Sequence, residues 1–147
     1  MKYSEAKQGR VFILRLEDGE ILHEEIEAFA KARGIGAAAV LILGGADENS
    51  VLISGPEKGR DSPPVPMEIV LGGVHEITGT GTIFPGKSGE PVLHMHIAAG
   101  RNGTCSAGCV RKGVKVWHVM EAIISELTST QACRVKDPQT GFELLEP

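Results

Sequence analysis

Residues 91–98 read PVLHMHIA, a run in which apolar side chains alternate with histidines. Alternation with a period of two is typical of a β-strand, in which successive side chains point to opposite faces of the sheet. The apolar residues of this run would face the core. His94 and His96 would project together from the other face, about 6–7 Å apart along the strand. The stretch therefore predicts a strand that carries two imidazoles placed for one metal ion.

The segments around this strand also have the composition of short strands. Apolar and β-branched residues are grouped between glycines and prolines, which typically mark turns and bulges. We predict strands over residues 11–16, 37–43, 50–54, 67–71, 74–84, 91–98 and 107–111. Their connections are too short for parallel crossovers, so the six to nine expected strands should pair mostly antiparallel.

One segment has helical periodicity instead. Between residues 20 and 33, apolar side chains recur at helical spacing, with glutamates in the first half and basic residues in the last turn. Asp18 is a candidate N-cap, and Gly34 is placed to end the helix. Residues 114–127 are ambiguous, because they fit a helical stripe as well as an alternating strand. The whole pattern predicts an α+β fold, one antiparallel sheet with a helix on a face.

The composition excludes several classes of protein. The chain has 147 residues, 41% hydrophobic and 23% charged, which is typical of a single globular domain, here residues 1–147. A net charge of −4 disfavours a broad electrostatic contact with nucleic acid, since phosphate binding needs clustered lysine and arginine. No apolar run approaches the roughly 20 residues of a membrane helix, and three cysteines are too few for a secreted disulfide framework. We therefore expect a cytoplasmic protein without membrane contact.

The histidine pair gains two further candidate ligands from neighbouring predicted strands. If residues 100–103 turn the chain back as a hairpin, Cys109 comes near His94 and His96. His75 lies on the preceding strand and is a candidate fourth ligand. Imidazole and thiolate together favour Zn²⁺ over Mg²⁺ or Ca²⁺, although imidazole also accepts Ni²⁺ and Fe²⁺. Four protein ligands would indicate a structural metal, whereas three ligands and a water would indicate a catalytic one.

Simpler interpretations of these residues stay open at this point. Hydrogen-bonded histidines are more common than ligand pairs, and Cys109 alone would be a small buried apolar residue. If a zinc-activated water reacts with a small molecule, Glu76 and Glu121 are candidate bases. Residues 58–60, KGR, carry two positive charges but lack the Arg-Gly-Arg-Pro run of an AT-hook.

The order of these segments along the chain resembles the PPC (plants and prokaryotes conserved) domain. The resemblance is carried by an opening strand and helix, glycine-bounded strands, the His-x-His strand and a closing arginine with a Thr-Gly-Phe motif. These segments are residues 11–29, 46–53, 76–83, 93–97 and 107–110, and Arg134 with residues 140–142. Cys109 stands where most members of the family carry a third histidine.

The resemblance implies an antiparallel sheet flanked by helices and assembled as a homotrimer, and it favours a strand for residues 114–127. In plants this domain follows AT-hooks, which bind DNA while the domain assembles and recruits partners. No AT-hook run occurs among these 147 residues, so the chain resembles a stand-alone prokaryotic-type member without direct contact to nucleic acid. We therefore expect a metal-binding homotrimer. The alternatives are a zinc-dependent enzyme that acts on a small molecule and a DNA-associated regulatory or scaffolding module.

Overall fold

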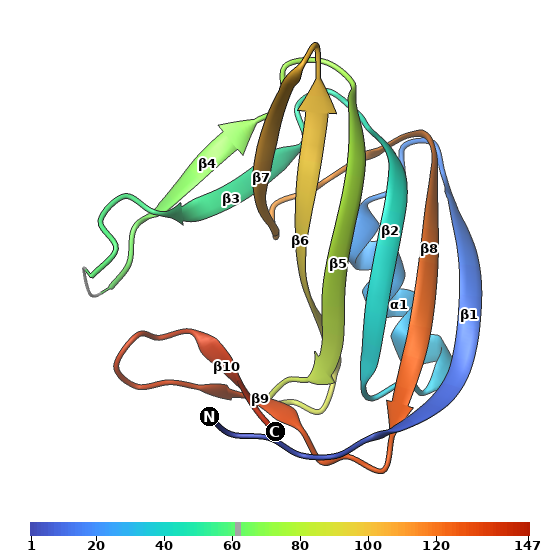
Figure 1. The fold of residues 1–147 in the computed structure, drawn as a ribbon, viewed down its shortest axis with the longest axis vertical. Coiled ribbons are helices and arrows are strands. Elements are labelled where there is room, and N and C mark those ends of the chain that lie inside the picture. Colours follow the sequence, from blue (N-terminus) through green and yellow to red (C-terminus); the bar gives the residue numbers. More distant parts are fainter. Residues whose placement is uncertain (61–62) are drawn as a thin grey trace.

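The computed structural model describes residues 1–60 and 63–147, and it has a large sheet, a small sheet and one helix (Figure 1). The elements are β1 (Lys7–Glu17), α1 (Leu22–Arg33), β2 (Ala38–Ala46), β3 (Val51–Pro56), β4 (Pro66–Val70), β5 (His75–Pro85), β6 (Pro91–Arg101), β7 (Thr104–Val110), β8 (Val116–Thr128), β9 (Cys133–Lys136) and β10 (Glu143–Glu146). The large sheet has the order β1-β8-β2-β5-β6-β7-β3-β4, and β9 pairs with β10. Every pairing between these strands is antiparallel.

This architecture agrees with the predicted class and corrects two details. A mostly antiparallel sheet with one helix is what the α+β prediction described, but the described residues contain a single helix where the resemblance implied several. They also contain ten strands instead of six to nine, because the short strand β9 has no alternating pattern long enough to detect. Of the described residues, none forms a helix long and apolar enough to cross a membrane.

The ambiguous segment forms the strand β8, as the resemblance favoured. From Met120 to Glu126 its buried residues alternate with more exposed ones, which is the period of a strand with one covered face. The strand lies between β1 and β2 and pairs with both. Two neighbouring strands satisfy its backbone hydrogen bonds on both sides, so the β-branched residues of this segment suit a central strand.

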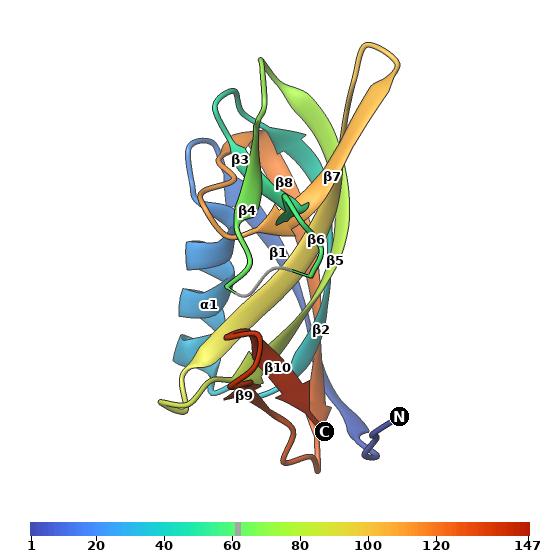
Figure 2. The same cartoon turned by 90° about the vertical axis from the view of Figure 1, so that its left-hand side faces the viewer.

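The helix α1 packs on one face of the large sheet, as Figure 2 shows from the side. Leu22, Ile26 and Ala30, spaced by four, are buried and belong to the same core cluster as apolar residues of the sheet. Residues at this spacing lie on one side of a helix, so the helix covers the sheet with a single apolar stripe. The main core therefore lies between α1 and this face of the sheet.

The two ends of α1 differ in how well they were predicted. Gly34 ends the helix in the left-handed conformation with φ 64°, which confirms the prediction. The predicted cap Asp18 is wrong, because Ile21 occupies the N-cap position and makes no side-chain capping bond. Asp18 instead accepts a hydrogen bond from the backbone N–H of His118, at 2.7 Å from N to Oδ1. Its carboxylate therefore joins the turn after β1 to β8.

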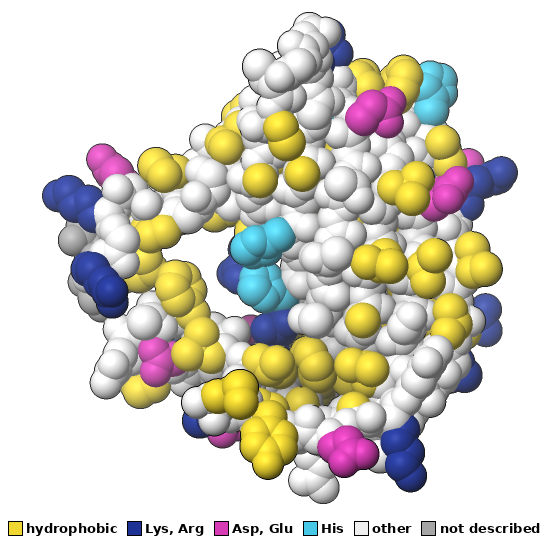
Figure 3. Space-filling model, in the orientation of Figure 1, with side chains coloured by type: hydrophobic (Ala, Val, Ile, Leu, Met, Phe, Trp, Pro, Cys, Tyr) yellow, Lys and Arg dark blue, Asp and Glu magenta, His cyan; other side chains and the backbone are white. Residues whose placement is uncertain are grey.

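The face of the sheet opposite α1, called here the outer face, carries one continuous row of residues across five strands. Ile13, Ile123 and Leu41 are neighbours on β1, β8 and β2. Their exposed fractions are 85%, 43% and 54%. The same register continues through Thr80 on β5 to His96 on β6. Figure 3 shows apolar side chains gathered over this part of the sheet, with histidines in a hollow beside them.

An ion pair between the exposed Arg10 and the buried Glu126 joins the first and eighth strands. Glu126 is 8% exposed and receives three hydrogen bonds from Arg10: Nη2 at 2.6 Å, Nε at 2.8 Å and the backbone N–H at 3.0 Å. The Arg10 side-chain bonds, followed by its backbone N–H, lower the pKa of Glu126 from 4.5 to about 2. The ionised carboxylate is therefore favoured in the folded chain more strongly than in the unfolded chain.

We expect Glu126→Gln to reduce the dependence of stability on acid pH. The pair stabilises the wild type fully above pH 4.5, and this stabilisation is lost as the pH falls toward about 2, because the unfolded chain takes up the proton first. The variant should be less stable than the wild type at neutral pH, and the difference should shrink over that interval. Urea unfolding across the pH range measures it. A difference that stays constant with pH would contradict the assignment.

Candidate metal centre

The structure brings His94, His96 and Cys109 together on the outer face. One ligand atom from each of the three lies within 4.8 Å of the other two. Leu93, Met95 and Ile97, which alternate with the histidines, are buried on the opposite face. The predicted alternation along this strand is therefore confirmed, and His94 and His96 project from one side of it.

A tight hairpin places the cysteine beside the histidines. The strands β6 and β7 are joined by a two-residue turn of Asn102 and Gly103, with φ of 50° and 77°. Two successive positive φ values are the conformation of the turns that best match the twist of a hairpin, and Asn-Gly adopts it readily. The resulting register sets His96 directly opposite Cys109. The prediction that residues 100–103 turn the chain back is confirmed.

The distances within the cluster suit a small cation. The Nε2 atoms of His94 and His96 are 3.2 Å apart, and their ring planes meet at 77°. Two imidazole nitrogens on a tetrahedral zinc, each at about 2.0–2.1 Å, would be roughly 3.3 Å apart. The same contact also suits a hydrogen bond between two neutral rings, which is the simpler interpretation. The nearby sulfur is what separates this cluster from an ordinary histidine pair.

The surroundings of His94 favour the form of its ring that binds metals. The pKa of His94 is lowered by burial and, in smaller part, by the positive charges of Arg134, His96 and Arg111. A neutral imidazole has a free lone pair for a metal. Arg111 donates from Nε to the Sγ of Cys109 at 3.2 Å.

The fourth predicted ligand, His75, is not brought to this cluster. In the pairing of β5 with β6, Thr80 lies opposite His96 and Thr82 lies opposite His94. An odd number of positions separates His75 from Thr80, so the side chain of His75 projects from the face opposite to that of Thr80 and His96. His75 also lies near the far end of the strand. Its Nδ1 is 2.9 Å from the backbone oxygen of Gly73. Three of the four predicted ligands therefore meet, and the fourth does not.

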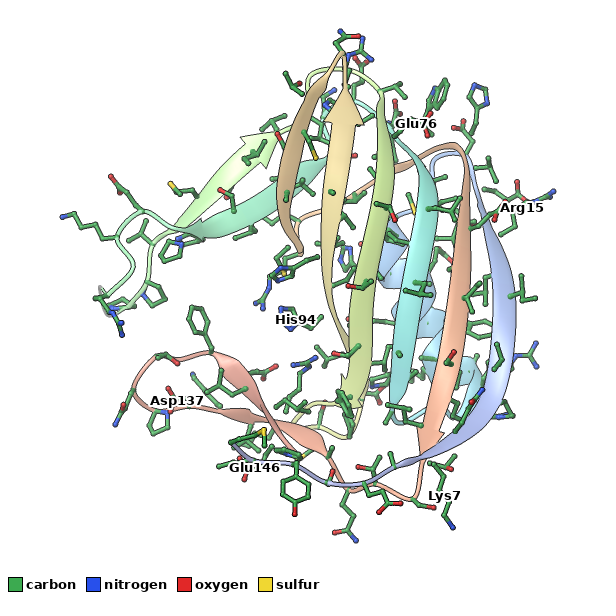
Figure 4. The ribbon with its side chains drawn as sticks, in the orientation of Figure 1. Lys7, Arg15, Glu76, His94, Asp137 and Glu146 are labelled. Atoms are coloured by element: carbon green, nitrogen blue, oxygen red, sulfur yellow. The ribbon has the colours of Figure 1, made fainter. Side chains whose placement is uncertain are left out.

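Two adjoining pockets open beside the cluster and share His94, Arg111, Phe142 and Glu143. The smaller, of about 360 Å³, is lined also by His23, Glu27, Val92, Leu93, Val110, Arg134 and Gly141. The larger, of about 590 Å³, is lined also by Ile53, Gly55, Pro56, Pro64, Pro66, His96, Cys109, Lys112 and Leu144. Figure 4 labels His94, whose ring points into the space between the β3–β4 and β9–β10 hairpins. A ligand of the histidine cluster would therefore meet apolar walls and two arginines.

The carboxylates proposed as bases do not lie at this site. Neither Glu76 nor Glu121 lines either pocket, and Glu121 lies on β8 between Arg15 and Leu43. The acidic groups of the pockets are instead Glu27 on α1 and Glu143 on β10. The position of Glu143 has no periodic signal in the sequence, because the small β9–β10 sheet meets the large sheet through tertiary packing alone.

Comparison with known proteins agrees with the fold. The model of the Plants and Prokaryotes Conserved (PCC) domain family matches residues 3–128. The comparison with curated proteins gives no match. A metal-containing protein from Archaeoglobus fulgidus is 26% identical, with a TM-score of 0.86 over 100% of both chains.

Two further solved structures extend this likeness. A plant- and prokaryote-conserved (PPC) protein from Pyrococcus horikoshii is 26% identical, with a TM-score of 0.86 over 100% of this chain and 98% of that one. A candidate DNA-binding protein from Bacteroides thetaiotaomicron, 18% identical with a TM-score of 0.77 over 96% of both chains, shows the shared fold alone. The family match covers most of the chain, in agreement with the motifs of the sequence. The chain therefore belongs to the Plants and Prokaryotes Conserved domain family.

Proposed function

We propose that this protein binds one Zn²⁺ through His94, His96 and Cys109. The observation that carries the proposal is the approach of their three ligand atoms to within 4.8 Å of one another on two adjacent strands. Two imidazoles and a thiolate are a donor set that zinc prefers. The similar protein from Archaeoglobus fulgidus is described as metal-containing, which supports a metal without identifying it.

The number of ligands supports a site that also accepts a small molecule. Zinc takes four ligands, and the cluster found among the described residues supplies three. The larger pocket reaches all three of these residues, so a ligand in it would lie against the metal centre. A zinc ion held in this way supplies Lewis-acid chemistry when it is bound. A zinc-dependent enzyme that acts on a small molecule is therefore the second candidate function, and the pocket is the observation that favours it.

Metal analysis tests the first proposal directly. Protein purified without chelators should contain about one zinc per chain. Replacement by Co²⁺ should give a near-ultraviolet thiolate-to-cobalt band, which Cys109→His should abolish while retaining the cobalt. Cys109→Ala should weaken metal affinity by more than the roughly 10–100-fold typical of groups that only orient ligands. Cys105→Ala is the matched control, since Cys105 is exposed and outside the cluster. It should change neither the cobalt band nor the metal affinity. Less than about a tenth of a zinc per chain would overturn the proposal.

We propose further that three copies of the chain assemble through the outer face. The apolar part of the row, Ile13, Ile123 and Leu41, is exposed in a single chain, and such exposed apolar patches typically mark sites of association. A homotrimer is also what the sequence resemblance implies. The row reaches the metal centre through Thr80, so the proposed centre would lie close to the contact between copies.

A charge placed in the row should prevent this assembly. We expect Leu41→Glu to reduce the mass from three chains to one at micromolar concentration, because a carboxylate cannot be covered by an apolar neighbour without a partner. Light scattering measures the mass. Val135→Glu is the control, since Val135 is 50% exposed but lies on β9, away from the row. A wild-type protein that is already monomeric would contradict the trimer.

A further inference from the structure

Two arginines beside the histidine pair have no carboxylate partner in an ion pair. Among residues 1–60 and 63–147, the ion pairs involve neither Arg111 nor Arg134. Arg134 is only 6% exposed; its Nη2 donates to Thr82 Oγ1 at 3.0 Å, whereas its buried Nε has no hydrogen-bond partner. Arg111 is exposed, and its Nε is directed to the Sγ of Cys109.

This arrangement is unfavourable in the absence of an anion. A buried charged group is costly unless it is paired, and a buried N–H without an acceptor adds to the cost. Burial lowers the pKa of Arg134, and the charge of Arg111 lowers it further, so the two guanidinium groups repel each other. A negatively charged ligand between them would relieve both penalties.

The smaller pocket offers the place for such an anion. Arg111 and Arg134 both line it, together with His94. Of its two acidic residues, Glu27 is already engaged, since its Oε1 accepts a hydrogen bond from the backbone N–H of Leu93 at 2.8 Å. Glu143 attracts Arg134 but makes no ion pair with it. The basic side of the pocket is therefore left for a ligand.

We propose that this pocket binds a small-molecule carboxylate whose oxygens accept hydrogen bonds from Arg134 and Arg111. A guanidinium presents a planar edge that matches a carboxylate. Part of the remaining wall is apolar, with Val92, Val110 and Phe142. Such a wall suits an apolar or aromatic tail, and a singly charged group is easier to remove from water there than a phosphate dianion. The site adjoins the proposed metal centre but consists of side chains that need no ion.

Benzoate is a suitable probe, because it joins a carboxylate to an apolar ring. Titration calorimetry on chelator-treated and on zinc-loaded wild type should detect benzoate with a Kd below about 10 mM, and the uncharged analogue benzamide should bind at least about 10-fold more weakly. Arg111→Gln in chelator-treated protein should also weaken benzoate at least about 10-fold. Arg134→Lys keeps the buried charge but loses the planar edge, so it should weaken benzoate binding to the same extent. Because the charge is kept, this variant is expected to fold. Arg15→Gln, on β1, is the control and should leave benzoate binding unchanged.

Each outcome supports or overturns the inference. It is overturned if folded wild type does not bind benzoate, if benzamide binds as well, or if both arginine variants bind like the wild type. Tighter binding of inorganic phosphate than of benzoate would show that the pocket is a phosphate site and would overturn the proposal of a carboxylate ligand. Zinc binding without benzoate binding would refute this inference alone. Benzoate binding to a protein that contains no zinc after metal-replete purification would refute the metal proposal alone.

Discussion

His96→Ala is expected to lower the zinc content from about one ion per chain to less than about a tenth. The substitution removes one of the three proposed ligands, and the two left cannot hold zinc in competition with water and buffer. His96 is exposed on the outer face, so its loss leaves no cavity in the core. The free energy of unfolding of the metal-free variant should therefore lie within about 0.5 kcal/mol of that of the metal-free wild type. Metal analysis and urea unfolding in the presence of a chelator measure the two quantities.

His75→Ala is the matched control for this experiment. His75 lies on the neighbouring strand but on the other face, and its Nδ1 contacts the backbone of Gly73. Its removal should leave the zinc content at about one per chain. Full retention of zinc in His96→Ala would show that the ligands lie elsewhere, and loss of zinc in His75→Ala would restore it as a ligand.

Met95→Ala is expected to have the opposite phenotype, although Met95 precedes His96 directly. Met95 is fully buried in the core cluster on the other face of β6. Its truncation should lower the free energy of unfolding by roughly 2–5 kcal/mol, through lost burial and the cavity that is left. The zinc content of the folded variant should stay at about one per chain, because the outer face is unchanged.

Urea unfolding of chelator-treated protein tests this prediction. Wild type and variant must be compared at one protein concentration, since association of copies stabilises the folded state by mass action. Met67→Ala is a control for the loss of a methionine side chain at a site that is 43% exposed, and it should change stability by less than about 0.5 kcal/mol. Equal effects of the two methionine variants would contradict the assignment of Met95 to the core.

Local pattern was enough to predict the part of the centre that depends on a single hairpin. The alternation around His94 and His96 indicates which way their rings point, and residues 100–103 indicate where the chain reverses. Both are properties of consecutive residues, and a strand of period two leaves little freedom once its core face is known. The approach of Cys109 to the histidines follows from these two facts.

The position of His75 could not be predicted in the same way. Whether it meets the histidines depends on the register between β5 and β6, and a change of one position moves a side chain to the opposite face. Thr80 and Thr82 occupy the neighbouring positions instead. The five residues that connect the two strands, 86–90, are compatible with more than one type of hairpin loop. The sequence therefore supports several pairings, and only the fold selects one.

The arginines of the smaller pocket illustrate a second limit. Arg134 comes from the β9–β10 hairpin, which is distant in sequence from the histidines and packs near the end of β5. Its Nη2 bond to Thr82 and its position over the ring of Phe84, 5.9 Å from the centroid, are tertiary contacts. No spacing rule within the chain connects these residues, so their meeting is a result of the fold alone.

The row that crosses the outer face also has a consequence for how an ion is exchanged. Leu41 and His96 are separated by two strand spacings, or about 10 Å. Neighbouring copies that cover Leu41 would stand between the ion and a chelator in solution. Dilution of the protein would then speed the loss of the ion to the chelator. The rate of metal loss would therefore report the concentration at which the copies dissociate.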